Sequence, residues 1–174
     1  EDLSKGMQQK IQFVATVLHK PKLLILDEPF SGFDPINANI IKDEILELKE
    51  NGSTIIFSTH RMESVEELCD QVALINKAKK ILDGSKKELK EQFKMNTFEI
   101  SYKGELTEND TIFSIINTDL NKEGIYTGQI RLKEGISTNE MINTLMNQVE
   151  LKGFNEKIPS MNDIFIAAVN GQNN

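Results

Sequence analysis

The sequence predicts an α/β fold in its first half, followed by a small α+β sandwich. Two short apolar runs, at residues 23–26 and 54–57, alternate with longer segments that carry apolar residues at helical spacing. This strand–helix–strand alternation is typical of a parallel sheet covered by helices. Later in the chain, residues 97–103 alternate between apolar and polar side chains, which predicts a strand. We therefore expect two domains, at residues 1–93 and 94–174.

The composition limits the kind of protein this can be. A net charge of −7 argues against a dedicated nucleic-acid surface, so no nucleic-acid partner is expected. The single cysteine, Cys69, excludes an internal disulfide and is typical of a reducing compartment. No apolar run approaches the ~20 residues that a membrane-spanning helix needs. The chain opens with Glu1-Asp2-Leu3 rather than methionine, which indicates a piece of a longer protein.

The first segment predicts a helix that begins near Ser4. Four apolar residues fall at the spacing of one helix face and are expected to be buried: Ile11, Val14, Ala15 and Leu18. Ser4 is placed to cap this helix, and Gly6 leaves its backbone amides approachable. A helix start with free amides is an anion site, although an ordinary serine cap explains the same residues.

The run Leu23–Leu26 predicts a strand buried on both faces, because it is short, apolar and bounded by Pro21 and Pro29. It ends in Asp27 and Glu28. Ligands of open parallel sheets bind at the carboxyl ends of the strands, so these carboxylates are placed to meet a polyphosphate and its magnesium ion. The alternative is a core strand whose polar end merely reaches solvent.

The next elements repeat this alternation. Asp34 followed by Pro35 predicts the start of a helix that runs from about Ile36 to Glu50. A second buried strand at 53–60 ends in hydroxyl side chains and His60, and a helix at 61–70 follows it. Residues 72–75 and 80–83 predict a hairpin.

The second half predicts the α+β sandwich. Strands are expected at 97–103, 128–133 and 151–157, and helices at 111–116 and 139–149. The helix at 139–149 is expected to bury one face made of Ile142, Leu145, Met146 and Val149. Ser160 caps a final helix, with Asp163 three residues later. No nucleophile–base pair or metal cluster is visible, so a scaffold or dimer-stabilising role and a ligand-sensing role both stay open.

The first ~90 residues resemble the C-terminal half of an ATP-binding-cassette (ABC) ATPase, a P-loop NTPase with a parallel sheet. Leu3–Met7 resembles the signature motif of this family, and Leu23–Glu28 resembles its Walker B strand with the catalytic glutamate. Ser31–Asp34 is similar to the D-loop, and His60 stands where the switch histidine is expected. The segment 159–169 resembles the tail of accessory domains in the bacterial drug- and sodium-export branch.

Two departures from the family pattern accompany this resemblance. Lys5 and Met7 stand where the signature motif usually has glycine and glutamine, a variation that resembles the same export branch. No Gly-x-x-x-x-Gly-Lys-Ser/Thr loop occurs in the sequence. We therefore expect this chain by itself to be inactive as an ATPase, and the intact protein to be active.

The resemblance implies a role for each residue at the strand ends. Asp27 would hold Mg²⁺ through a water molecule, Glu28 would polarise the attacking water as the general base, and His60 would contact the γ-phosphate of ATP. Phosphoryl transfer to water depends on positioning and charge neutralisation, which these side-chain types supply.

The resemblance also implies partners. Ser4 and Gly6 would touch the γ-phosphate of a nucleotide held by a second ABC ATPase subunit, with Asp34 near the junction of this nucleotide-sandwiched dimer. An integral membrane permease would be the other partner, which places the protein in the cytoplasm on the inner face of the cell membrane. The expected function is ATP hydrolysis that powers transport. The alternatives are a cytosolic ABC-type ATPase that transports nothing, and a catalytically silent interaction or regulatory fragment.

Overall fold

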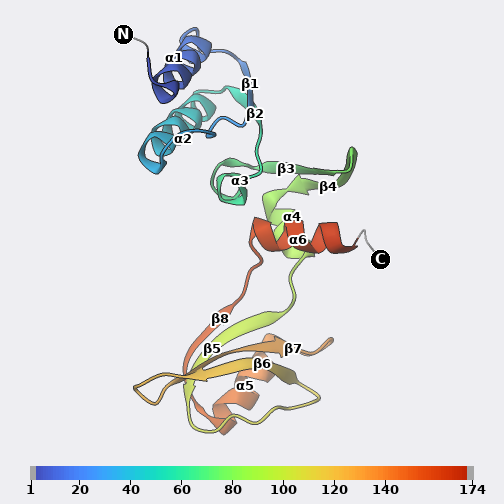
Figure 1. Ribbon diagram of the computed structural model, residues 1–174. Coiled ribbons are helices and arrows are strands. Elements are labelled where there is room, and N and C mark those ends of the chain that lie inside the picture. The colour runs from blue at the N-terminus through green and yellow to red at the C-terminus, as the bar shows by residue number, and fades with distance from the viewer. Residues whose placement is uncertain (1–2, 172–174) are drawn as a thin grey trace. The chain divides into compact units, whose positions relative to one another are not determined.

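The computed structural model describes residues 3–171 and divides the chain into two compact units, residues 1–70 and 71–174 (Figure 1). The first unit contains α1 (Lys5–Val17), β1 (Leu23–Asp27), α2 (Pro35–Glu50), β2 (Thr54–Ser58) and α3 (Met62–Leu68). The second contains β3 (Gln71–Asn76), β4 (Lys79–Ser85), α4 (Lys86–Gln92), β5 (Thr97–Lys103), β6 (Phe113–Leu120), β7 (Tyr126–Leu132), α5 (Thr138–Gln148), β8 (Glu150–Glu156) and α6 (Met161–Gly171). None of the helices described at residues 3–171 is both long and apolar enough to cross a membrane.

The first unit has the predicted α/β character. β1 and β2 pair in parallel, with a register that runs from Leu23 opposite Thr54 to Asp27 opposite Ser58. α2 connects the two strands, as expected for a parallel crossover. The helix begins where the sequence predicts, because Asp34 caps it and accepts a hydrogen bond from the N–H of Asn37 at 3.0 Å.

The core of the first unit lies on one face of the strand pair. Its buried members come from α1, the loop after β1, α2 and α3: Phe13, Phe30, Ile41, Ile45 and Leu68. Leu24 of β1 is buried, whereas Leu23 and Ile25 are 53% and 69% exposed. The expectation that β1 is buried on both faces is therefore wrong for this chain, since Leu23 and Ile25 point to the face opposite Leu24 and are exposed.

The buried face of α1 also differs from the prediction. Phe13 is buried and Val17 packs beside it, while all four predicted residues, Ile11, Val14, Ala15 and Leu18, are exposed. Phe13 and Val17 are one helical turn apart, so a single turn of α1 reaches the core. Helical spacing identified the helix correctly but assigned its contacts to the wrong face.

The second unit begins with a hairpin and two helices. β3 and β4 pair antiparallel, as predicted, and α4 and α6 contact each other and β4. Ser85 caps α4 in a reciprocal arrangement with Glu88, in which each side chain accepts from the backbone N–H of the other. Ser160 and Asp163 form the same arrangement at the start of α6, as the sequence predicts.

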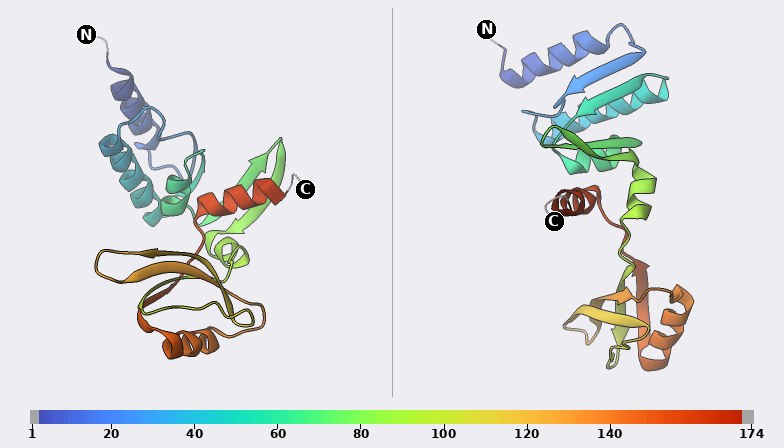
Figure 2. Two further views of the ribbon diagram at one scale, coloured as in Figure 1. Left: turned by 60° about the horizontal axis from the view of Figure 1, so that its bottom comes forward. Right: turned by 90° about the vertical axis from the view of Figure 1, so that its right-hand side faces the viewer.

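The predicted sandwich is a four-stranded antiparallel sheet in the order β6-β7-β5-β8. Both views in Figure 2 show α5 lying against one face of this sheet. The core between them is formed by alternate residues of the strands and one face of the helix: Phe98, Ile100, Tyr102, Phe113, Ile130, Met141, Leu145 and Val149. The other face carries polar side chains, as an antiparallel sheet with one solvated side requires.

Two predictions in this part are corrected. Residues 113–120 form strand β6 rather than part of a helix at 111–116, because the segment is rich in β-branched isoleucine and threonine, which favour strands, and pairs with β7. In α5 the core face is Met141, Leu145 and Val149, while Met146 is 63% exposed. Met146 lies one position after Leu145 and is rotated by about 100° from the core.

Candidate active site at the ends of β1 and β2

The carboxyl ends of the two parallel strands bring four polar side chains together with one histidine. β1 ends at Asp27 and is followed by Glu28, and β2 ends at Ser58 and is followed by Thr59 and His60. Asp27 and Ser58 are opposite each other in the register. The N–H of Glu28 donates to the carbonyl oxygen of Ser58 at 3.0 Å, so the pairing extends one residue beyond the strands. The predicted Asp27, Glu28 and His60 therefore lie in one site.

Glu28 has an unusual backbone and a firmly held carboxylate. Its φ is +44°, in the left-handed region that non-glycine residues seldom occupy. Oε1 accepts from the backbone N–H of His60 at 2.9 Å and lies 2.7 Å from Nδ1 of its ring. Oε2 accepts from the hydroxyl of Thr59 at 3.3 Å. Backbone strain that is retained at the end of a strand is a feature of functional sites.

Electrostatics keep Glu28 ionised. The side-chain hydrogen bond from His60 lowers the pKa of Glu28 from its ordinary value, and the backbone N–H and the charge of His60 act in the same direction. Partial desolvation opposes this effect on the pKa. The result is a carboxylate that is a ready hydrogen-bond acceptor at neutral pH.

His60 presents its ring to solvent while it contacts Glu28. The side chain of His60 is 79% exposed and that of Glu28 is 33% exposed. With Nδ1 occupied by Glu28, the opposite edge of the imidazole, with Nε2, is the part open to an incoming group. Nδ1 donates to the Glu28 carboxylate, and Nε2 can donate at the same time when the ring is protonated on both nitrogens.

Asp27 is held by its neighbour across the strand pair. The hydroxyl of Ser58 donates to Oδ1 of Asp27, and the carboxylate is otherwise exposed. Within residues 3–171 there is no cluster of three or more histidine, cysteine, aspartate or glutamate side chains that could surround a metal ion. Asp27 therefore presents a single exposed carboxylate at the end of β1.

The remaining predicted residues lie on other elements of the same unit. Ser4 caps α1, where its hydroxyl accepts from the N–H of Met7 at 3.3 Å. A Cβ added to Gly6 would meet no atom within 4 Å, so the start of α1 is open at this position. Asp34 caps α2, and hydrogen bonds from Asn37 lower the pKa of its carboxyl. No hydrogen bond of the described residues joins Ser4 or Asp34 to the Glu28–His60 pair.

Three polar contacts in this unit were not predicted. The first two are the hydroxyls of Ser58 and Thr59 that hold the two carboxylates. The third is Gln9, whose side-chain amide donates to the carbonyl oxygen of Ser31 at 3.0 Å and ties α1 to the loop before α2. The hydroxyls could have been found from the sequence, because the ends of adjacent parallel strands lie side by side. The contact between Gln9 and Ser31 could not be predicted in this way, because the two residues do not lie at the ends of adjacent strands.

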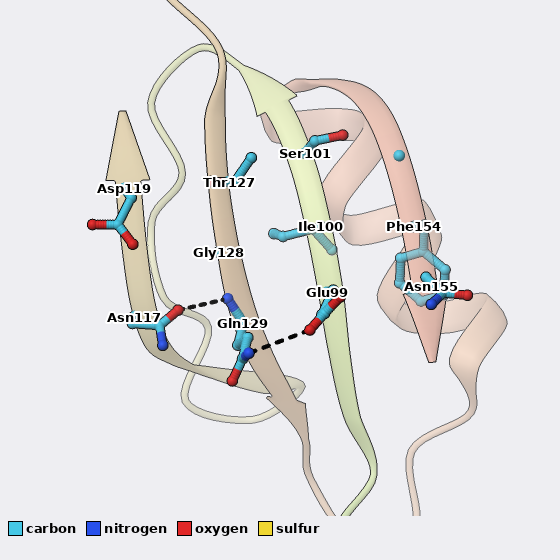
Figure 3. A pocket seen from close by; sticks show the side chains of 11 residues that line it. Glu99, Ile100, Ser101, Asn117, Asp119, Thr127, Gly128, Gln129, Phe154 and Asn155 are labelled. Carbon is cyan, nitrogen blue, oxygen red and sulfur yellow. Dashed lines mark hydrogen bonds between the residues drawn. The ribbon is translucent and has the colours of Figure 1, made fainter. Parts of the chain in front are cut away.

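The second unit carries a hollow on the open face of its sheet, with a volume of about 460 Å³ (Figure 3). Outward-pointing side chains from all four strands line it, among them Glu99, Ser101, Asn117, Asp119, Gln129 and Asn155. The backbone N–H of Gln129 donates to Oδ1 of Asn117 at 3.1 Å, and its side chain donates to Glu99 at 3.4 Å. Gly153 deepens the floor, since a Cβ there would come within 2.6 Å of the Ser101 hydroxyl.

Family models match both parts of the chain. The model of the "ATP-binding protein DrrA1-3-like, C-terminal domain" matches residues 84–169. A model described as "AAA domain, putative AbiEii toxin, Type IV TA system" matches residues 1–66.

Curated proteins match nearly the whole chain. An uncharacterised ABC transporter ATP-binding protein of Bacillus subtilis is 40% identical over 173 residues, which are 97% of this chain and 56% of that protein. Another, from Alkalihalophilus pseudofirmus, is 38% identical over 175 residues, with 97% and 62% covered. The fluoroquinolones export ATP-binding protein of Mycobacterium tuberculosis is 30% identical over 169 residues, with 97% and 50% covered.

This chain thus spans 50–62% of the length of these three relatives. The order of its elements, the residues at the ends of β1 and β2, and matches over almost all of its length point to one family. The chain belongs to the ATP-binding proteins of ABC transporters and covers the C-terminal half of the ABC ATPase followed by a DrrA1-3-like C-terminal domain.

Proposed function

We propose that the protein hydrolyses ATP to drive transport through a separate membrane subunit, with Glu28 as the general base. The observation that carries this proposal is the carboxylate of Glu28 at the end of a parallel strand, held on Oε1 by His60 at 2.7 Å. A general base must be ionised and within reach of the proton it accepts. The lowered pKa of Glu28 supports the first condition. Its position at the carboxyl end of β1 supports the second, since ligands of such sheets bind there.

His60 has two roles in this proposal. Its Nδ1 contact orients Glu28, and Nε2 on the exposed ring edge would donate to the γ-phosphate of ATP with the ring protonated on both nitrogens. The arrangement couples the presence of the phosphate to the position of the base, because one imidazole touches both. Positioned hydrogen bonds of this kind stabilise the charge that develops during phosphoryl transfer.

The residues present fit a magnesium ion. Mg²⁺ prefers oxygen ligands, keeps several water molecules and is usually bound by one or two carboxylates together with substrate phosphates. Asp27 offers one exposed carboxylate that Ser58 holds in place. When bound, the ion would neutralise charge on the phosphate oxygens of ATP. In our proposal Asp27 contacts it through a water molecule.

The start of α1 would contact the nucleotide that is bound by a second ATPase subunit. Ser4 and Gly6 lie at a helix N-terminus, where free amides and the helix dipole favour a phosphate group. Asp34 at the start of α2 would lie near the junction of the two subunits. The working enzyme is then a dimer with ATP sandwiched at the shared sites.

The transported compound belongs to the membrane subunit in this proposal. A relative named for fluoroquinolones export, 30% identical, supports an exporter of small molecules. The protein would act in the cytoplasm, peripheral to the inner face of the cell membrane and docked to the permease. Residues 1–93 would supply the ATPase part and residues 94–174 the accessory domain. The names of the relatives favour transport over the alternative of a cytosolic ATPase without a membrane partner.

The test is Mg-ATP hydrolysis by the complete gene product, with Glu28→Gln compared with wild type. Loss of a general base typically costs ~10²–10⁴-fold in rate. ATP binding should be retained, because the amide keeps the shape of the side chain. The matched control is Glu63→Gln, the same change at an exposed position in the first turn of α3. Unchanged turnover in Glu28→Gln would show that Glu28 is not the base.

Ligand sensing is a second candidate function for the C-terminal sheet, and the hollow in Figure 3 is the observation that favours it. Its lining includes two carboxylates, from Glu99 and Asp119, and no lysine or arginine. This lining favours a small cationic ligand over an anionic one. Spermidine should raise the melting temperature of wild type but not of Glu99→Gln/Asp119→Asn, and citrate should raise neither. Equal effects of spermidine on both proteins would leave a scaffold as the role of this sheet.

A further inference from the structure

The hydroxyl of Thr59 occupies the centre of a short chain of hydrogen bonds. It donates to Oε2 of Glu28 at 3.3 Å and accepts from the backbone N–H of Arg61 at 3.1 Å. Arg61 is the N-cap residue of α3, and no side chain makes a capping hydrogen bond to this helix. One hydroxyl therefore joins the carboxylate at the end of β1 to the first turn after β2.

This contact completes the fixation of the Glu28 carboxylate. His60 holds only Oε1, through its N–H and its ring. A carboxylate held at one oxygen can still rotate about that contact, whereas one held at both oxygens keeps a defined plane. Thr59 supplies the second point of attachment.

The backbone of Glu28 adopts a conformation that its surroundings must hold in place. Glu28 occupies the left-handed region at φ +44°, which non-glycine residues adopt at a cost unless the surroundings enforce it. Its carbonyl oxygen accepts from the N–H of Ser31 at 3.0 Å in the turn that follows. The backbone thus turns away from β1 at this residue, and its side chain reaches the segment after β2 only through His60 and Thr59.

We infer that Thr59 is a positioning residue that fixes the carboxylate of Glu28 for attack by water and links it to the segment carrying His60. This inference rests on the proposed function of Glu28 as the general base. Only a side chain that both donates and accepts a hydrogen bond can fill the role, so serine can replace threonine and valine cannot. Valine keeps the shape and removes the hydroxyl.

The first measurement needs no catalysis. Only His19 and His60 give histidine side-chain signals in this chain, and His19 serves as an internal reference. In ¹⁵N-labelled protein, Thr59→Val should shift the ring signals of His60 and the backbone amide signals of residues 60 and 61, while His19 stays unchanged. Thr59→Ser should leave the His60 signals at their wild-type positions. Thr54→Val is the matched control, since it is the same change at an exposed position in β2, the strand that precedes Thr59.

The second measurement is steady-state hydrolysis by the complete gene product. Misplacing a reacting group by about 1 Å can cost ~10²-fold in rate. We expect Thr59→Val to lower kcat by ~10- to 100-fold with KM for Mg-ATP within about threefold of wild type. Thr59→Ser should recover kcat to within about threefold, and Thr54→Val should match wild type.

The outcomes separate this inference from the proposed function. Unchanged His60 signals in Thr59→Val would overturn the inference whatever the rates are. Equal losses of kcat in Thr59→Ser and Thr59→Val would also overturn it, because the hydroxyl would not be the cause. If Glu28→Gln retains full turnover while Thr59→Val still shifts the His60 signals, the proposed function fails and the contact between Thr59 and Glu28 stands.

Discussion

Nδ1 of His60 lies 2.7 Å from Oε1 of Glu28, and the backbone N–H of His60 donates to the same oxygen at 2.9 Å. His60 thus holds Oε1 of Glu28 with two different groups, its backbone N–H and its imidazole ring. The backbone N–H makes its contact at every pH, whereas the strength of the ring contact depends on the protonation of the imidazole. Removal of the ring should therefore weaken the stabilisation of the Glu28 anion without abolishing it.

His60→Ala should raise the pKa of Glu28 toward the ordinary glutamate value. The side-chain hydrogen bond from His60 is the largest cause that lowers this pKa, and the variant deletes it together with the charge of the ring. The measurement is a pH titration of the ¹³C signal of the Glu28 side-chain carboxyl. Asp34 is the control, because its pKa is lowered by hydrogen bonds from Asn37 and should not change. An unchanged titration midpoint for Glu28 would contradict the 2.7 Å contact.

The residues at the ends of β1 and β2 could be predicted because they follow from sequence order alone. A strand that ends in two carboxylates and a strand that ends in hydroxyls and a histidine must meet if the strands are parallel neighbours. The structure has this pairing, and Asp27, Glu28 and His60 lie in one site. The left-handed backbone of Glu28 could not be predicted, since no glycine or asparagine marks the position.

The packing of helices was predicted less well than their positions. The apolar period of α1 and α5 locates both helices, but each has apolar residues on more than one face. Which face is buried depends on the sheet that the helix meets, and a single helix does not contain that information. β6 shows the same limit, because its strand conformation depends on pairing with β7.

The corrected face of α5 can be tested with two methionines on the same helix. Met141 is fully buried in the core against the sheet, and Met146 is 63% exposed. Met141→Ala should lower the free energy of unfolding by about 2–5 kcal/mol, because it deletes buried apolar atoms and leaves a cavity. Met146→Ala should change it by no more than about 0.5 kcal/mol. Urea denaturation followed by circular dichroism measures both, and equal losses would restore the face that the sequence predicted.

The reciprocal cap of α6 should make stability depend on pH. Asp163 accepts from the hydroxyl of Ser160 at 2.7 Å and from its N–H at 2.9 Å, and these bonds lower the pKa of Asp163 from its ordinary value of 3.8. A group with a lowered folded-state pKa stabilises the fold fully above its unfolded-state pKa and loses this contribution as the pH falls through the folded-state value.

Asp163→Asn should therefore lower the melting temperature at pH 7 by roughly 2–4 °C. The difference from wild type should narrow once the pH falls below about 4, where the carboxylate becomes protonated in the unfolded state, and should close as the pH falls through the lowered pKa of folded Asp163. Asp110→Asn is the control, because Asp110 is exposed and lies in the loop before β6. A difference that stays constant from pH 7 to pH 3 would mean that the charge of Asp163 does not contribute.

The turn between β3 and β4 places two L-residues in a conformation that suits glycine. Lys77 and Ala78 have φ values of +47° and +59°, and Asn76 pairs with Lys79 across the two-residue loop. Positive φ at both central positions matches the twist of a hairpin, but it costs a residue with a Cβ roughly 1–2 kcal/mol.

Ala78→Gly removes that cost and adds about 0.4–1 kcal/mol of chain entropy to the unfolded state. We expect a net gain of roughly 0.5–1 kcal/mol in the free energy of unfolding. Ala73→Gly, the same change in the extended backbone of β3, should lose a similar amount, so urea denaturation of the two variants should give opposite signs. A loss of stability in Ala78→Gly would contradict the left-handed conformation of the turn.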